Sequence, residues 1–197
     1  MSKQRTQERQ TRTSGCKFHV REEGGEKRLE GYFSVFGDTY ELWPGATESI
    51  DPHAFDGALS DDIRVLIDHE SRLVLGRTSA GTATLSADDH GLFGSVLINA
   101  DDQDAMNLYA RVQRGDVSQA SFGFDILEEE TEYREDGSIH WIIKKVKLYE
   151  VSVVTFPAYR DTEIAARKAD FADIQKRKVE AWKNERLNRL KKLGAKE

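Results

Sequence analysis

Three short segments of the chain carry side chains that could do nucleophilic chemistry. LIDHES contains His69, QASFGF contains Ser121, and YEVSVVTFPAYR contains Glu150. Each segment is an apolar, strand-like run of its own. A serine hydroxyl is a weak nucleophile until a base removes its proton, and a carboxylate can orient a histidine that acts as that base. A histidine, a serine and a carboxylate in this arrangement are the parts of a nucleophilic hydrolase.

The surroundings of each residue favour this chemistry, but each also has a plainer interpretation. Small residues near Ser121, namely Ala120 and Gly123, would let a substrate backbone approach closely. His69 follows the apolar run IRVLI, at a strand end from which a general base could reach a cleft. Glu150 is the one acid in LYEVSVVTF, where burial is costly unless the carboxylate is paired. The alternatives are an ordinary strand serine, a structural histidine and an outward-facing glutamate on an edge strand.

Other common site patterns are missing from the sequence. The serine motif is not G-x-S-x-G, which disfavours the nucleophile elbow of the α/β-hydrolases. No H-E-x-x-H or C-x-x-C motif and no cluster of histidines occurs, so we expect neither a metal site nor another cofactor.

The elements that must position these residues are mostly strands. Residues 63–67 and 92–98 are short apolar runs typical of buried strands, and Asp136-Gly137 predicts a hairpin between two β-rich flanks. A helix is predicted from the Asp101–Asp102 cap to Gly115. Seven or eight short strands with one internal helix indicate a mainly β fold with helices (α+β), a closed or nearly closed barrel with helical decoration.

Charge and composition divide the chain into three regions. Residues 1–21 and residues 160–197 each carry a net charge of +5, which leaves −16 for residues 22–159. The acidic body excludes a nucleic-acid-binding fold, although the basic ends could contact nucleic acid weakly. We expect a disordered basic tail at 1–15, a folded domain at 16–166 and a basic helical tail at 167–197. The single cysteine, Cys16, fits a reducing compartment, and the absence of a secretory signal or membrane-spanning run predicts a soluble, intracellular protein.

Six motifs in order, taken together, resemble a known family. They are GYFSVFG, HAFDGAL, LIDHES, DDHGLFGSV, ASFGF and YEVSVVTFPAY, and the resemblance that they carry covers about Leu29 to Arg167. This series resembles the tailed-phage (caudovirus) prohead serine proteases, which are similar to the herpesvirus maturation proteases (assemblins). The resemblance implies an assemblin-like barrel of about seven strands surrounded by helices.

The resemblance also implies roles for particular residues. Ser121 is expected to be the nucleophile and His69 the general base. YEVSVV aligns with the assemblin strand that carries a second histidine, which puts Glu150 in that histidine's place. The oxyanion-binding loop is expected near Ala158, Tyr159 and Arg160, although FPAYRD departs from the assemblin Gly-Arg-Arg pattern.

The expected biology follows from the same resemblance. The enzyme would act inside the immature phage head, in the host cytoplasm, and cut the scaffolding protein or the scaffolding segment of the major capsid protein, and also itself. Expected partners are these capsid components and further copies of the chain, in a dimer or larger assembly, with no membrane. The alternatives are an inactive capsid-assembly or scaffolding protein with the same barrel, a nucleic-acid-associated protein acting through its basic ends, and a serine esterase or amidase acting on small molecules.

Overall fold

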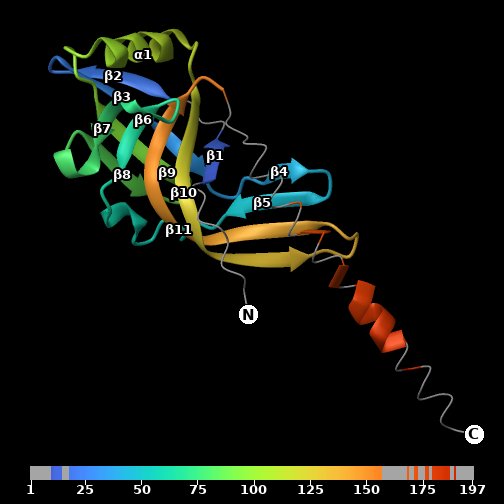
Figure 1. Cartoon of the computed structure of the whole chain (residues 1–197). Helices are drawn as coiled ribbons and strands as arrows, with labels where there is room; N and C mark the ends of the chain where they lie inside the picture. The colour runs from blue at the N-terminus through green and yellow to red at the C-terminus, as the bar shows by residue number, and fades with distance from the viewer. Residues whose placement is uncertain are drawn as a thin grey trace, which may run out of the picture. The chain divides into compact units, whose positions relative to one another are not determined.

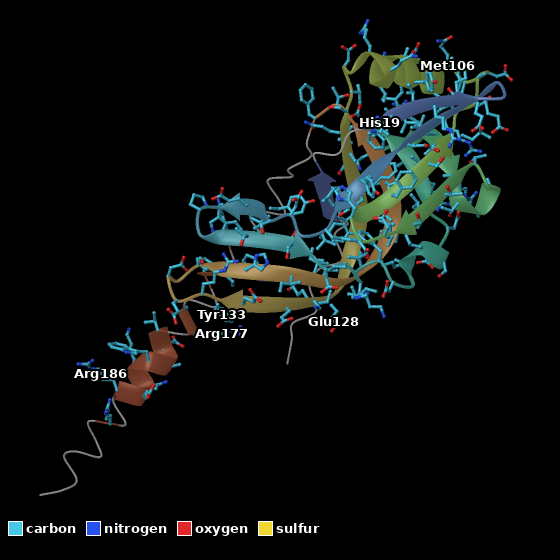
Figure 2. All side chains as sticks on the ribbon, turned by 180° about the vertical axis from the view of Figure 1, so that it is seen from behind. His19, Met106, Glu128, Tyr133, Arg177 and Arg186 are labelled. Carbon is cyan, nitrogen blue, oxygen red and sulfur yellow. The ribbon has the colours of Figure 1, made fainter. Side chains whose placement is uncertain are left out.

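The structure is a computed structural model. It describes residues 10–14 and 18–156, and further along the chain residues 168, 171–172, 176–177, 179–186 and 189. The chain divides into two compact units, Met1–Tyr159 and Arg160–Glu197. The described residues of the second unit, Arg177 and Arg186 among them, are helical (Figure 2). None of the described helices is long and apolar enough to cross a lipid bilayer.

The first unit is built from strands, one α-helix and two short 3₁₀ turns (Figure 1). In chain order these are β1 (Gln10–Ser14), β2 (His19–Glu23), β3 (Glu26–Val35), β4 (Tyr40–Trp43), β5 (Ala46–Ile50), η1 (Ala58–Ser60), β6 (Arg64–Ile67), β7 (Glu70–Arg77), η2 (Thr78–Ala80), β8 (Ala83–Ala87), β9 (Gly91–Leu97), α1 (Gln103–Arg114), β10 (Gln119–Tyr133) and β11 (Ile139–Val154).

Helix α1 follows the sequence prediction closely. The Asp102 side chain caps its first turn by accepting hydrogen bonds from the backbone N–H groups of Asp104 and Ala105. Gly115 ends the helix with a φ of 87°, in the left-handed region that favours glycine. The buried face consists of Ala105, Leu108, Tyr109 and Val112, at the spacing of an amphipathic helix. The predicted helix is therefore confirmed.

The larger sheet is organised around the long strand β11. Its strand order is β1-β10-β11-β5-β4, and β6 also pairs with β11 and carries β7 as its second neighbour. β10 runs antiparallel to β11 over nearly its whole length. On the other side of β11, residues Ile139–Ile143 pair in parallel with β5, and residues Glu150–Val153 pair in parallel with β6. One strand therefore has two successive partners along the same edge.

The first part of β11, the last part of β10 (Glu129–Tyr133), β5 and β4 form an extension that we call the arm. Figure 1 shows the arm projecting from the body of this unit, at the end opposite α1. Figure 2 shows Glu128 near the base of the arm and Tyr133 toward its tip, where Tyr133 pairs with Ile139. A hairpin at Asp136-Gly137 is confirmed, with Gly137 at a φ of 84°, but residues 134–138 connect the strands in place of the two-residue turn that this dipeptide signals.

The smaller sheet has the order β2-β3-β9-β8 and packs over the body half of the larger one. Aromatic rings join the elements of this core: Phe18 meets Phe33 edge-on with ring centroids 5.2 Å apart, and Phe55 meets Phe122 at 5.6 Å. Phe122 and Phe124 stack on each other at 4.8 Å. The strand that carries Ser121 is thus fixed by the core through its apolar residues.

The mainly β, α+β class is confirmed, but the prediction of a closed barrel is wrong. Among the described strands both sheets are open, with edges at β1, β4 and β7 in one and at β2 and β8 in the other. The prediction assumed short strands of similar length. Instead β10 and β11 have 15 and 16 residues, and Glu129–Tyr133 of β10 and Ile139–Ile143 of β11 leave the body to build the arm. Strands that splay apart in this way do not return to close one barrel.

The N-terminal segment also differs from the expectation. Residues 1–15 were expected to be a tail without structure, yet Gln10–Ser14 form β1, which pairs antiparallel with β10. The polar composition of this segment gives no apolar signal, because its order comes from backbone pairing with a strand more than a hundred residues away.

Candidate active site

His69 lies in a two-residue hairpin turn between β6 and β7. Ile67 pairs with Glu70, so Asp68 and His69 are the two central residues of the turn. Both have positive φ angles, 49° and 61°, and they are the only non-glycine residues with positive φ in the described part of the chain. Turns of this kind usually contain Asn-Gly, because positive φ costs an ordinary residue about 1–2 kcal/mol. A histidine held in such a conformation is typical of a functional site.

Asp68 fastens this turn to the end of β11. Its backbone N–H donates to the Val153 carbonyl at 3.0 Å. Its carboxylate accepts hydrogen bonds from the Thr155 backbone N–H at 2.7 Å and from the Thr155 hydroxyl at 3.2 Å. These contacts oppose the backbone strain and fix the position of His69 relative to the strand that carries Glu150.

Ser121 and Glu150 lie on neighbouring strands in the middle of the larger sheet. Ser121 on β10 is directly opposite Ser152 on β11, and Gly123 is opposite Glu150. Side chains two residues apart on a strand share a face, so Glu150, Ser152 and Ser121 project to the same side. All three are buried, with 2%, 0% and 0% of their surface exposed.

The imidazole of His69 bridges the other two predicted residues. Its Nε2 lies 2.8 Å from the Ser121 Oγ, and its Nδ1 lies 2.8 Å from Glu150 Oε1. An ionised carboxylate can only accept, so Nδ1 carries the proton and donates to Glu150. Nε2 is then left as the acceptor of the Ser121 hydroxyl proton. The hydroxyl–imidazole–carboxylate series is the arrangement that activates a serine in nucleophilic hydrolases.

Ser152 is a further member of this group that the sequence analysis did not single out. Its hydroxyl donates to Glu150 Oε2 at 2.6 Å, so both oxygens of the buried carboxylate have a hydrogen-bond partner. Such a short bond to a charged acceptor is among the stronger hydrogen bonds in proteins. The alternation in YEVSVV places positions 150 and 152 on one face, and that signal could have identified Ser152.

The structure also bears on the plainer interpretations. An ordinary strand serine would bond to the backbone, whereas the Ser121 hydroxyl lies within hydrogen-bonding distance of a histidine nitrogen. Glu150 is buried on an interior strand between β10 and β6, so it is not an outward-facing edge residue. The predicted oxyanion region, Ala158, Tyr159 and Arg160, lies outside the described residues.

Within 10–14, 18–156 and the described part of the second unit, no group of three or more His, Cys, Asp or Glu residues is arranged to hold a metal ion. The polar side chains gathered around His69 are instead a hydroxyl and a carboxylate on its two ring nitrogens.

Comparisons with known proteins agree with this chemistry. The model of the family described as caudovirus prohead serine protease matches residues 16–177. The chain is 30% identical over 164 residues to the prohead protease of Enterobacteria phage HK97, an alignment that covers 81% of this chain and 68% of the relative. No solved structure matches. The chain belongs to the caudovirus prohead serine protease family, the proteases of bacteriophage capsid maturation.

Proposed function

We propose that this protein is a serine endopeptidase with Ser121 as nucleophile, His69 as general base and Glu150 as the residue that orients His69. The observation that carries the proposal is the pair of 2.8 Å contacts that His69 makes, one to the Ser121 hydroxyl and one to the Glu150 carboxylate. Ser121 and Glu150 lie on two neighbouring strands and His69 lies in a hairpin turn, 52 residues from Ser121 and 81 from Glu150 in sequence. Burying polar side chains together is costly, and clusters of this kind are typical of catalytic sites.

In the first half of the reaction, His69 Nε2 takes the hydroxyl proton as Ser121 Oγ attacks the carbonyl carbon of the scissile peptide. The C–N bond then breaks, and the leaving amine takes the proton from His69. In the second half, His69 removes a proton from water, the resulting hydroxide attacks the acyl-enzyme, and Ser121 recovers its proton. Glu150 keeps Nδ1 protonated throughout and stabilises the imidazolium, while Ser152 holds the carboxylate in place.

The negative charge on the substrate oxygen during attack needs donors as well. The backbone N–H groups of Ala158–Arg160 remain our prediction for that role, with the Arg160 side chain as an electrostatic aid. Asp68 holds Thr155, a few residues earlier in the chain, through two hydrogen bonds. The same side chain that fixes the His69 turn thus also anchors the segment that leads toward the predicted oxyanion loop.

The proposed substrates, cut inside the prohead, are the chain itself and the scaffold, which is either a separate scaffolding protein or a segment of the major capsid protein. The basic residues beyond about Arg167 are proposed to mediate packaging into the prohead and to be removed by self-cleavage. Packaging of a chain truncated at Arg167 at the normal level, or an intact C-terminus in mature heads by mass spectrometry, would contradict these two proposals respectively.

The test of the proposed activity is co-expression with the cognate capsid proteins, followed by gel electrophoresis and mass spectrometry. Ser121→Ala is expected to abolish processing while the chain stays folded. Ser49→Ala is the matched control, because Ser49 also lies within hydrogen-bonding distance of a histidine Nε2, that of His140, at 2.9 Å. Processing by Ser121→Ala at the wild-type rate would refute the assignment.

One observation favours a second candidate, an assembly protein of the same fold without activity. Ser121 has no exposed surface in this structure. A fluorophosphonate probe separates the two candidates, because it labels an activated serine and leaves an inert one unmodified. Failure to label Ser121 in the prohead-associated chain would favour the assembly protein.

A further inference from the structure

The nucleophile of this site is closed off from its substrate. Ser121 is 0% exposed, and its Oγ lies 2.8 Å from His69. A peptide carbonyl must come within about 3–3.5 Å of the attacking oxygen. No external peptide can do so while Ser121 stays fully covered, so some element beside it has to move before cleavage.

Strand β1 lies directly beside the nucleophile. It pairs antiparallel with β10 from Gln10 opposite Phe124 to Ser14 opposite Ala120, and Thr13 is opposite Ser121. The other side of this stretch of β10 is filled by β11. Figure 1 shows β1 as a short, dark blue arrow next to the two long strands. The segment Ala120–Phe124 is thus flanked by β11, which carries Glu150, and by β1.

Of the two flanking strands, β1 is the one that can leave. Among the described strands it pairs with β10 alone, whereas β11 pairs with β10, β5 and β6. Its sequence, QTRTS, contains no large apolar residue. The strand is only five residues long and lies at an edge of the larger sheet, where local opening costs less than in the sheet interior.

The edge that β1 covers is of the kind that binds extended peptides. A peptide can add to a sheet edge through main-chain hydrogen bonds, which do not depend on its sequence. Next to Ser121, that edge can hold one strand at a time. We propose that residues 10–14 occupy the place of the substrate strand, and that an extended substrate peptide pairs with Ala120–Phe124 only after β1 has left. This inference rests on the proposed function, since it takes Ser121 as the nucleophile.

The size of the effect follows from how often the edge is open. If β1 is displaced in about 1–10% of molecules, reaction at Ser121 is slowed by about ten- to a hundredfold relative to a permanently open edge. The pairing also gives the prohead a means of control, because Arg12 of β1 and the basic residues before it in sequence can be attracted by an acidic partner.

The experiment measures the rate at which a fluorophosphonate labels Ser121 in the full-length chain. In the variant Arg12→Pro/Thr13→Pro, at least one of the two lost N–H groups faces β10, because successive residues of a strand point their N–H groups in opposite directions. Labelling is expected to be about tenfold faster or more. The control Lys3→Pro/Gln4→Pro changes the same number of residues outside β1 and is expected to label at the wild-type rate.

A milder variant, Arg12→Gly/Thr13→Gly, weakens the strand through backbone entropy and is expected to label at an intermediate rate. The glycine variant tests the proposal if the proline variant does not fold. Folding of each variant is judged by the hydrogen exchange of α1 and β9. In addition, a synthetic peptide of residues 7–15 is expected to slow labelling of the proline variant. The same peptide with prolines at positions 12 and 13 is expected to have no effect.

Equal labelling of Ser121 in the wild type, the glycine variant and the proline variant would overturn this inference and leave the proposed function intact. Absence of labelling in all of these folded chains would overturn the proposed function, and this inference with it. Faster labelling in the strand variants, with the outer control unchanged, supports both.

Discussion

Two histidines of this protein have almost the same hydrogen-bonding pattern in two different regions. His69, in the body, lies between Ser121 on Nε2 and Glu150 on Nδ1, both at 2.8 Å. His140, in the arm, lies between Ser49 on Nε2 at 2.9 Å and Thr47 on Nδ1 at 2.8 Å. Each imidazole therefore has a serine hydroxyl in position for proton transfer. A histidine–serine contact alone does not distinguish the two regions.

The partner of Nδ1 makes the difference. At His69 it is a carboxylate, which stabilises the imidazolium that forms when the serine gives up its proton. At His140 it is a neutral hydroxyl. Burial lowers the pKa of His140, and the nearby positive charge of Arg134 lowers it further, against smaller opposite effects of Glu132 and Glu48. These effects favour the neutral form of the arm histidine, as suits a structural link between β5 and β11.

Backbone conformation separates the two residues as well. His140 lies in the regular parallel pairing of β11 with β5, opposite Thr47. His69 lies in a turn with positive φ, fastened by Asp68. The position of the imidazole in the body therefore depends on a strained backbone conformation, whereas the position of the imidazole in the arm does not. Four predictions test this contrast.

The largest effect is expected from the serines. Ser121→Ala removes the nucleophile and should lower peptide cleavage by about 10³-fold or more. Ser49→Ala removes the equivalent contact in the arm and should leave cleavage at the wild-type level. The rates are measured on purified capsid protein, and circular dichroism checks the fold. Comparable losses in both variants would show that the contrast is not catalytic.

The partners of Nδ1 come next. Glu150→Gln places an amide beside His69 that can donate to Nδ1 and thus put the ring proton on Nε2, facing Ser121. We expect kcat to fall by about 10²–10⁴-fold, with a measurable residual rate. Thr47→Ala changes the corresponding partner of His140 and should leave kcat unchanged. A wild-type kcat for Glu150→Gln would exclude Glu150 from the triad.

A smaller effect is expected from Ser152. Ser152→Ala removes one donor from the buried Glu150 carboxylate, a bond of the class that contributes about 1.5–3 kcal/mol. Since His69 remains as a partner, we expect only about a tenfold fall in kcat, with KM unchanged. Ser152→Thr keeps the hydroxyl and should restore most of the rate. An effect on KM alone would indicate a role in substrate binding instead.

The smallest effect concerns His140 and appears in stability rather than catalysis. Because its pKa in the folded protein is below the ordinary value of 6.5, the unfolded chain binds more protons as the pH falls below 6.5. The free energy of unfolding should therefore decrease with falling pH in this window. His140→Gln should reduce that decrease, as measured by urea denaturation at pH 7.5 and 5.5. An identical pH dependence in the two proteins would contradict the prediction.

Much of the site could be predicted from the sequence, because its chemistry depends on residue types that stand out in apolar strands. Ser121 and Glu150 were visible as polar residues in apolar runs and His69 as a histidine after one, the family resemblance suggested the roles of Ser121 and His69, and the structure brings all three together. Ser152 was missed, since a serine in a strand has many ordinary explanations. Helix α1 was predictable from local signals alone, its cap, its apolar spacing and its terminal glycine.

The open sheets and β1 were not predictable in the same way. The two partners of β11 depend on pairing between segments far apart in sequence, and strand composition does not specify which strands become neighbours. The residues of β1 are polar, and their order comes from the edge of β10. Composition identifies what a segment can do, whereas long-range pairing decides where the segment lies.

The reverse turn that carries His69 also makes the protein sensitive to changes in length at one point. Ile67 at the end of β6 pairs with Glu70 at the start of β7, so the connection between the two strands consists of only two residues. Inserting or deleting one residue there would turn the imidazole away from Ser121, because a shift of one position sends strand side chains to the opposite face. Changes in length at the arm tip or in surface loops should therefore leave the His69–Ser121 contact intact, whereas a longer β6–β7 connection is expected to break it.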